Sequence, residues 1–178
     1  MENLEKEKSV KRKKNKVLGW FFDAFVVVAI FVAIQMWMQR DMAGGEAIDF
    51  KAMTTSGENI ALSDYKGKPL LLHFWASWCH YCTFEQGSIT DISKDTPVLT
   101  VAFQSGSTIE VAEFMEKKGI SSWVTIVDEE GDISKNYGVS AVPATFIIDE
   151  NGKIRFKTAG FTSEWGLKLR LWLTSLLY

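Results

Sequence analysis

Cysteine and histidine are scarce in this sequence of 178 residues. The cysteines are Cys79 and Cys82 alone, and the histidines are His73 and His80. Two cysteines are too few for a disulfide scaffold. A structural zinc site usually needs four ligands, and the chain has no second cysteine pair. A c-type haem site would need histidine at the position of Thr83. We therefore predict no metal site and no cofactor.

A basic stripe is also missing from most of the chain. The net charge is -2, but residues 1–17 carry +4 and the remaining 161 residues carry -6. Nucleic-acid binding depends on clustered positive charge, so this class of partner is excluded. Hydrophobic residues make up 47% of the chain, which is enough for an ordinary core. The length fits one domain with an appendage.

A long hydrophobic run follows the basic N-terminal residues. It covers residues 18–38, and as a helix these 21 residues would span roughly 31 Å, close to the thickness of a bilayer core. Trp20 and Trp37 lie near its ends, where aromatic rings prefer the membrane interface. The sequence predicts a cytoplasmic basic tail at 1–17 and a transmembrane anchor at 18–38.

A cleaved signal peptide is the competing interpretation of this run. Signal peptides have shorter apolar regions followed by a small-x-small cleavage site, and Ala43-Gly44-Gly45 is a poor match. We favour the anchor. In both interpretations the rest of the chain is exported. We expect a single-pass inner-membrane protein with a cytoplasmic N-terminus and an extracytoplasmic, or periplasmic, catalytic domain.

The remaining chain reads as a tether at 39–47 and one domain at 48–178. Apolar runs predict a hairpin from 48–54 and 58–62, strands at 70–75, 97–103 and 123–127, and a final hairpin whose second strand is 154–158. Helical patterns cover 80–94, the segment after the Ser107–Glu110 capping box, 134–137 and 162–178. In the last helix the spacing of apolar residues predicts an inward face made of Trp165, Leu169, Trp172, Leu173 and Leu176. This order of elements predicts an α/β fold with a mixed central sheet flanked by helices.

The two cysteines come directly after the strand 70–75, which is apolar on both faces except at His73. Disulfide exchange needs an exposed thiolate, a nearby second thiol and a lowered thiol pKa. A Cys-x-x-Cys pair at the start of a helix supplies all three, because free backbone N–H groups there favour an anion on Cys79. A soft-metal site for copper and a structural disulfide stay open as alternatives. A redox-active disulfide between Cys79 and Cys82 is favoured.

Two segments carry a family resemblance. The stretch from Phe74 through Trp78 to Cys82 closely resembles the active-site signature of thioredoxin-like proteins, and Val142-Pro143-Ala144-Thr145 resembles their cis-proline loop. Within that superfamily the chain resembles the membrane-anchored TlpA-like disulfide oxidoreductases, especially the suppressor-of-copper-sensitivity D (ScsD) type. The resemblance covers about residues 46–176. It implies a thioredoxin-like fold with an N-terminal β-hairpin extension.

The resemblance also implies residue roles. Cys79 would be the nucleophile and Cys82 the resolving thiol. Pro143 would be cis and face the pair, which leaves the Val142 backbone to bind an extended substrate segment. Glu85 occupies a position where related TlpA-like reductases have a glutamate that acts on protonation of the pair.

This chain departs from its relatives at three places. His73 replaces a buried Asp or Asn, and it is either a proton relay or a hydrogen-bonded core residue. The dipeptide between the cysteines is His80-Tyr81, and a histidine there can make the disulfide more oxidising. Gly87 stands where a helix-kinking proline often occurs, and glycine also permits a bend.

The resulting functional prediction is an extracytoplasmic thiol–disulfide oxidoreductase. Its expected partners are thiols and disulfides of exported proteins and a membrane redox partner. Two alternatives remain, namely a reductant in cytochrome c maturation and a copper-binding module.

Overall fold

The computed structural model describes residues 2–177, and it describes side chains from residue 19 to residue 177. The chain forms two compact units, one ending at Arg40 and the other beginning at Asp41. The first unit is a single helix, α1 (Glu2–Gln39). The segment Gly19–Gln39 of this helix is long enough and apolar enough to cross a membrane. Its mean hydropathy is 2.1, and its side chains are exposed. The predicted basic tail has its side chains outside the described residues.

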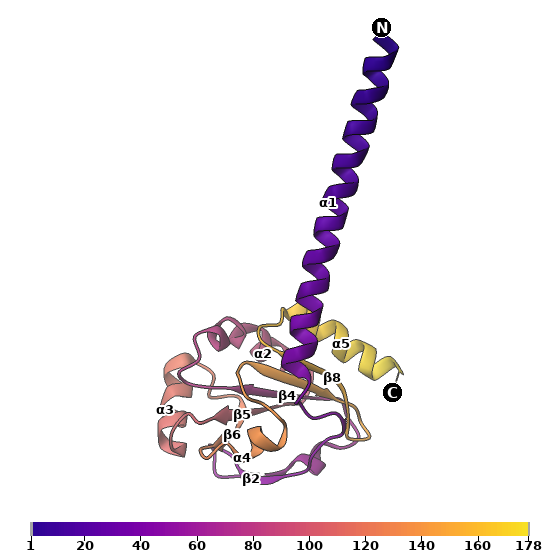
Figure 1. Ribbon diagram of the computed structural model, residues 1–178. Helices are drawn as coiled ribbons and strands as arrows, with labels where there is room; N and C mark the ends of the chain where they lie inside the picture. Colours follow the sequence, from indigo (N-terminus) through magenta and orange to yellow (C-terminus); the bar gives the residue numbers. More distant parts are fainter. Residues whose placement is uncertain (1, 178) are drawn as a thin grey trace. The chain divides into compact units, whose positions relative to one another are not determined.

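The second unit is built on a mixed sheet that has six strands within the described residues (Figure 1). These strands are β1 (Gly45–Glu46), β4 (Leu70–Trp75), β5 (Val98–Phe103), β6 (Val124–Asp128), β7 (Ala144–Ile148) and β8 (Lys153–Ala159). Their spatial order is β1-β8-β7-β4-β5-β6. Strands β4, β5 and β6 are parallel, whereas β7 pairs antiparallel with β4 and β8, and β1 pairs antiparallel with β8. The mixed α/β sheet predicted from the sequence is confirmed.

Strand β4 is buried along its whole length, as its continuous apolar sequence predicts. Its side chains alternate between two hydrophobic cores. Leu71 and Trp75 pack on the side of α2 (Gln86–Ile92), α3 (Thr108–Lys118) and α5 (Glu164–Leu177). Leu72 and Phe74 pack on the other side with Tyr137, which follows α4 (Asp132–Asn136). His73 therefore lies on the α2 side of the sheet, between Leu71 and Trp75 in the alternation.

The segment before the sheet is more ordered than a tether. Met42 is buried, the Ala43 N–H donates to the Tyr137 carbonyl at 2.9 Å, and β1 pairs with β8. These contacts correct the expected tether at 39–47, because packing against the domain begins at residue 42. The expected hairpin forms from β2 (Lys51–Met53) and β3 (Asn59–Ala61), and a 3₁₀ turn (Leu62–Tyr65) follows it.

The helices confirm one capping prediction and correct one length. Ser107 and Glu110 form the predicted capping box at the start of α3, and Gly119 ends α3 in the left-handed conformation that glycine adopts at no steric cost. The helix expected over 80–94 is instead a 3₁₀ turn (Tyr81–Phe84) followed by α2. The two pieces meet at Glu85, whose side chain is buried.

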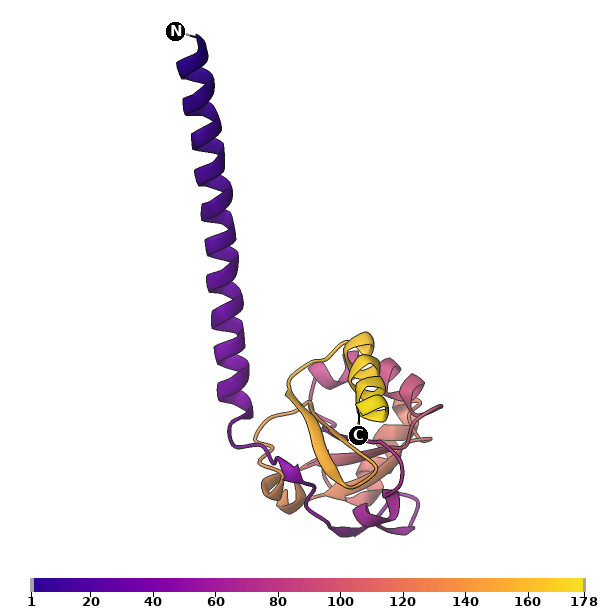
Figure 2. The same cartoon turned by 90° about the vertical axis from the view of Figure 1, so that its right-hand side faces the viewer.

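Helix α5 packs beside the sheet (Figures 1 and 2), but the face that it turns inward is not the one expected from the sequence. Its inward residues are Leu167, Leu171 and Thr174. Four residues expected to face inward, Trp165, Leu169, Trp172 and Leu176, are exposed by 84%, 55%, 57% and 62%. Both sets repeat every three or four residues, so spacing alone could not choose between two apolar faces.

This orientation predicts very different losses of stability for two alanine substitutions in α5. Leu167→Ala removes a fully buried side chain and should lower the free energy of unfolding by about 2–5 kcal/mol. Trp165→Ala removes an exposed side chain and should change it by no more than about 0.5 kcal/mol. Urea unfolding of the full chain in mild detergent measures both. A larger loss for Trp165→Ala than for Leu167→Ala would show that the Trp165 face packs on the sheet.

Candidate active site

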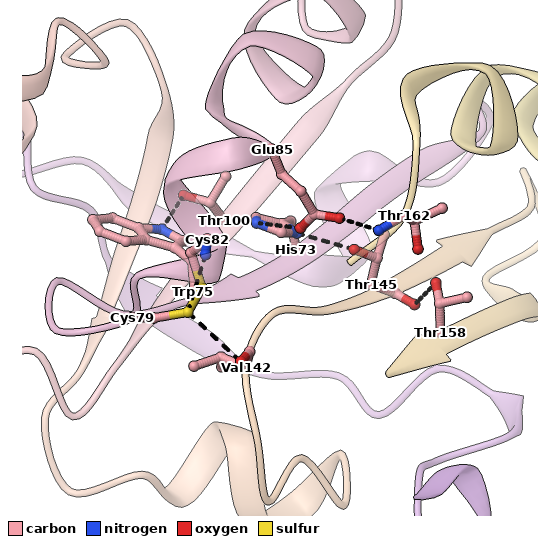
Figure 3. A network of polar contacts seen from close by, with 10 residues as sticks. All are labelled: His73, Trp75, Cys79, Cys82, Glu85, Thr100, Val142, Thr145, Thr158 and Thr162. Carbon is pink, nitrogen blue, oxygen red and sulfur yellow. Dashed lines mark hydrogen bonds and ion pairs between the residues drawn. A yellow bond between two sulfur atoms is a disulfide. The ribbon is translucent and has the colours of Figure 1, made fainter. Parts of the chain in front are cut away.

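The two cysteines form a disulfide just beyond the end of β4, with their Cα atoms 5.4 Å apart (Figure 3). The loop that carries them is held by the segment after β5. The Ser77 N–H donates to Ser105 Oγ at 2.9 Å, and Trp78 Nε1 donates to the Gln104 carbonyl at 3.0 Å. The end of β4 thus brings the disulfide to the sheet edge, as expected.

The sulfur of Cys79 faces two backbone groups. The Cys82 N–H points at Cys79 Sγ over 3.1 Å, and the Val142 carbonyl oxygen lies 3.6 Å from the same sulfur. The Val142–Pro143 peptide bond is cis, which confirms the expectation for Pro143. Cys79 and Cys82 are 6% and 4% exposed, so their exposure does not distinguish them. The two sulfurs are distinguished instead by the Cys82 N–H, which stabilises an anion on the Cys79 sulfur once the disulfide opens.

His73 and Glu85 meet in the buried layer near the disulfide (Figure 3). His73 Nδ1 lies 3.0 Å from Thr145 Oγ1, and the Thr162 N–H donates to Glu85 Oε1 at 2.5 Å. The remaining atoms, His73 Nε2 and Glu85 Oε2, are 3.9 Å apart. Neither has a hydrogen-bond partner among the described residues. The fold therefore places two buried titratable groups face to face.

Burial changes the protonation of both groups in opposite senses. It lowers the pKa of the His73 imidazole to about 3. It raises the pKa of the Glu85 carboxyl to about 7, against the opposing effect of the Thr162 hydrogen bond. Burial penalises the charged form in each case. At neutral pH the histidine is uncharged, and the carboxyl gains or loses a proton readily.

Exposed aromatic residues adjoin the two cysteines in the sequence. Tyr81 and Phe84 are exposed, and the His80 ring lies 6.2 and 5.3 Å from theirs, centroid to centroid. Trp78 is exposed on the other side of Cys79 in the sequence. We call His80, Tyr81 and Phe84 the aromatic cluster. Such a surface suits contact with another protein rather than packing within this one.

Sequence reasoning missed the residues that hold this site together. Thr145 and Thr162 bind His73 and Glu85, and Ser105 and Gln104 hold the loop before Cys79. The pairing of Thr145 opposite His73 in neighbouring strands could have been found from the register of β4 and β7. The Thr162 contact joins positions 77 residues apart and has no local signal.

Metal ligands do not gather elsewhere in the part of the chain that the structure describes. Within residues 19–177, no group of three or more His, Cys, Asp or Glu side chains could hold a metal ion. The groups that the structure brings together at this edge of the sheet are two sulfurs, a buried imidazole and a buried carboxyl.

Comparison with known proteins gives a consistent result. Residues 43–157 match the model of the AhpC/TSA family. The thiol–disulfide oxidoreductase ResA of Bacillus subtilis is 34% identical over 139 residues, which cover 76% of this chain and 77% of ResA. A thioredoxin-like protein of Haemophilus influenzae is 28% identical over 89% of this chain and 95% of its own length. The crystal structure of the exposed lipoprotein thioredoxin Etrx1 from Streptococcus pneumoniae superposes with a TM-score of 0.65 at 30% identity, covering 71% of this chain and 99% of that one.

The buried carboxyl predicts an unusual dependence of stability on pH. Because the pKa of Glu85 rises from 4.5 to about 7 on folding, the folded protein keeps a proton that the unfolded chain has lost. The stability that this bound proton contributes is complete below the pKa of Glu85 in the unfolded chain, and it is lost as the pH rises through about 7. The difference in free energy of unfolding between Glu85→Gln and the wild type is taken at about pH 4 as the baseline. Relative to that baseline, the variant should become more stable than the wild type by up to about 3 kcal/mol at about pH 8.

Urea unfolding at a series of pH values measures this difference, with the exposed residue Glu113 changed to Gln as the matched control. The difference isolates Glu85, since the lowered pKa of His73 has the opposite effect on stability and is common to both proteins. If Glu85→Gln instead loses stability as the pH rises, the carboxyl is ionised in the folded state and paired with a charged His73.

Proposed function

This chain belongs to the AhpC/TSA family of thioredoxin-like proteins and is a thiol–disulfide oxidoreductase, and we propose that it exchanges disulfides with exported proteins at the outer face of the cell membrane. The observation that carries the proposal is the Cys79–Cys82 disulfide beside the Val142 carbonyl. The site provides a disulfide bond to break, a backbone N–H that stabilises the Cys79 thiolate when the mixed disulfide is resolved, and a backbone acceptor for a bound segment.

The exchange uses the two cysteines in order. A thiolate of the partner protein attacks Cys79 Sγ, the Cys79–Cys82 bond breaks, and the electron pair leaves with Cys82. A second partner thiolate then attacks the partner's own sulfur in the mixed disulfide and releases Cys79 as a thiolate. The partner gains a disulfide and this chain becomes a dithiol. The reverse sequence reduces a partner disulfide.

His73 and Glu85 would take part in supplying the proton that the Cys82 thiolate needs. When Cys82 leaves as a thiolate, it forms a negative charge in a buried site, where an unpaired charge is costly. Glu85 lies one turn further along, and its N–H donates to the Cys82 carbonyl at 3.2 Å. Burial raises the pKa of its carboxyl to about 7, so near neutral pH this group can give a proton to the Cys82 sulfur and regain one afterwards. His73 faces the second carboxyl oxygen and takes part as a neutral acceptor or donor.

The surroundings of the disulfide fit a protein partner. Val142 offers its carbonyl oxygen beside Cys79, where an extended segment can pair with the backbone. The aromatic cluster and Trp78 offer apolar contact next to it. We assign partner binding to Val142, Trp78 and the aromatic cluster, with Pro143 shaping the loop.

The N-terminal unit supports attachment to the membrane. Residues Gly19–Gln39 can span a bilayer, and the preceding basic residues would stay in the cytoplasm by the positive-inside rule. The catalytic domain would then be extracytoplasmic. A membrane redox partner is needed to restore the disulfide or the dithiol after each cycle. Assignment to the ScsD type stays a prediction.

The order of attack predicts which cysteine variant traps partners. Cys82→Ala leaves Cys79 able to form a mixed disulfide that no internal thiol can resolve, so adducts with exported proteins should accumulate. Cys79→Ala should give few adducts. Non-reducing gel electrophoresis after alkylation of free thiols measures both. Equal trapping by the two variants would reverse or abolish the assigned roles.

The direction of exchange predicts a reduction potential. An oxidant or isomerase should have a value near -120 to -180 mV, and this is the outcome we expect with His80 beside Cys79. Equilibration of the full chain in detergent with glutathione buffers measures the potential, with His80→Gly as the matched variant. A potential below about -250 mV would instead support the runner-up, a reductant in cytochrome c maturation.

A further inference from the structure

Thr145 holds one ring nitrogen of His73 and leaves the other facing Glu85. Thr145 lies opposite His73 in the antiparallel pair of β4 and β7, so the two side chains stand on the same face of the sheet. Both are buried, with exposed fractions of 3% and 1%. Within the described residues, the Thr145 hydroxyl has His73 Nδ1 as its hydrogen-bond partner, at 3.0 Å (Figure 3). A hydroxyl can donate or accept, so this contact permits either neutral form of the imidazole.

The second ring nitrogen of His73 faces Glu85 without being bonded to it. Nε2 lies 3.9 Å from Glu85 Oε2, and neither atom has a hydrogen-bond partner among the described residues. The Trp123 ring packs edge-on against the imidazole, and its own N–H donates to Thr90. The causes of the two pKa shifts are burial and, for Glu85, the Thr162 hydrogen bond, with no contribution from another charged side chain among those described. The contact between His73 and Glu85 therefore depends on where these two groups carry their protons.

The 3.9 Å gap distinguishes the arrangements that these protons can adopt. The Thr162 N–H donates to Glu85 Oε1, so a proton on this carboxyl belongs on Oε2. An Oε2–H group would donate to an unprotonated Nε2, and an Nε2–H group would donate to an ionised Oε2; either pair would close to about 3 Å. An ionised carboxyl facing an unprotonated Nε2 would leave a buried charge without a partner, which is costly. In the remaining arrangement both atoms carry a proton, so neither can accept from the other.

We propose that Thr145 is a positioning residue for the exchange reaction, because its hydroxyl donates to Nδ1 and keeps the His73 proton on Nε2, facing Glu85. The inference rests on the proposed transfer of a proton from Glu85 to Cys82. When the disulfide bond breaks, Cys82 leaves with the electron pair and takes the Glu85 proton. The carboxylate that remains accepts the His73 N–H. Thr145 thus favours release of the proton and leaves the imidazole uncharged.

Nuclear magnetic resonance of the full chain in detergent tests this assignment in the disulfide form, in which neither cysteine titrates. His80→Gln is the background protein, because it leaves His73 as the single histidine. Long-range ¹H–¹⁵N spectra show which ring nitrogen carries the proton. At about pH 5, where the Glu85 carboxyl is protonated, we expect Nε2–H in the background protein and after Thr145→Ser, which keeps the hydroxyl. After Thr145→Val the proton should move to Nδ1, because Nε2 then accepts from Glu85.

The His73 ring signals, followed across pH, also give the midpoint for ionisation of Glu85, which is identified because Glu85→Gln abolishes it. Thr145→Val should raise this midpoint by about one pH unit or more, because the Oε2–H group gains an acceptor. Thr145→Ser should leave it unchanged. Thr125→Val is the matched control, since Thr125 is also buried but bonds Thr100 at 2.7 Å. A purely structural role of Thr145 would lower the free energy of unfolding without moving the midpoint.

Two results would overturn the role of Thr145. One is a proton on Nδ1 in the background protein at about pH 5, which decides the matter even where Thr145→Val does not fold. The other is the same midpoint in Thr145→Val and Thr145→Ser. The rate of exchange with a reduced peptide that has two cysteines tests the underlying proton transfer separately. If Glu85→Gln exchanges as fast as the wild type, Glu85 does not supply the Cys82 proton, and Thr145 orients His73 without serving the reaction.

Discussion

The antiparallel pairing of β4 with β7 is the constraint on which the site depends. The register sets His73 opposite Thr145 and Phe74 opposite Ala144. Since the two strands run in opposite directions, the loop that leaves β4 and the loop that enters β7 meet at one edge of the sheet. One loop carries Cys79 and the other carries Pro143. A slip of one residue in this pairing would turn every side chain of β7 to the other face and separate His73 from its threonine.

The same strand explains why a polar group is tolerated in the core. Strand β4 is covered on both sides, so each polar side chain on it must find a partner or lose its charge. His73 gains one hydrogen-bond partner in Thr145 and remains neutral. Glu85 gains one from the backbone of Thr162, just before α5. Helix α5 thus contributes to the site without carrying a reacting group, because the segment that leads into it fixes the carboxyl.

Sequence patterns predicted the parts of this fold that local physics determines. The continuous apolar run predicted β4 with its observed bounds, and the Ser107–Glu110 spacing predicted the cap of α3. The cysteine spacing and the Val142-Pro143 segment located the site, with help from a family resemblance. The failures concern long-range choices. Spacing could not decide which apolar face of α5 turns inward, and it could not pair Glu85 with Thr162 across 77 residues. The packing of residues 42–47 was missed because it depends on Tyr137 and on β8, which both lie far along the chain.

The two cysteine sulfurs have nearly equal exposure, but their different environments suit them to different chemical roles. A backbone N–H points at Cys79, so an anion on this sulfur is stabilised without a proton. Cys82 is buried one turn before the Glu85 carboxyl, whose pKa burial raises to about 7, so a proton is available at neutral pH to neutralise the Cys82 sulfur as it leaves. In the proposed exchange the electron pair therefore moves to Cys82 together with a proton, while Cys79 forms the mixed disulfide and is released as a thiolate in the second step. His73 preserves this division, since burial lowers the pKa of its imidazole to about 3 and the neutral ring adds no charge beside Glu85.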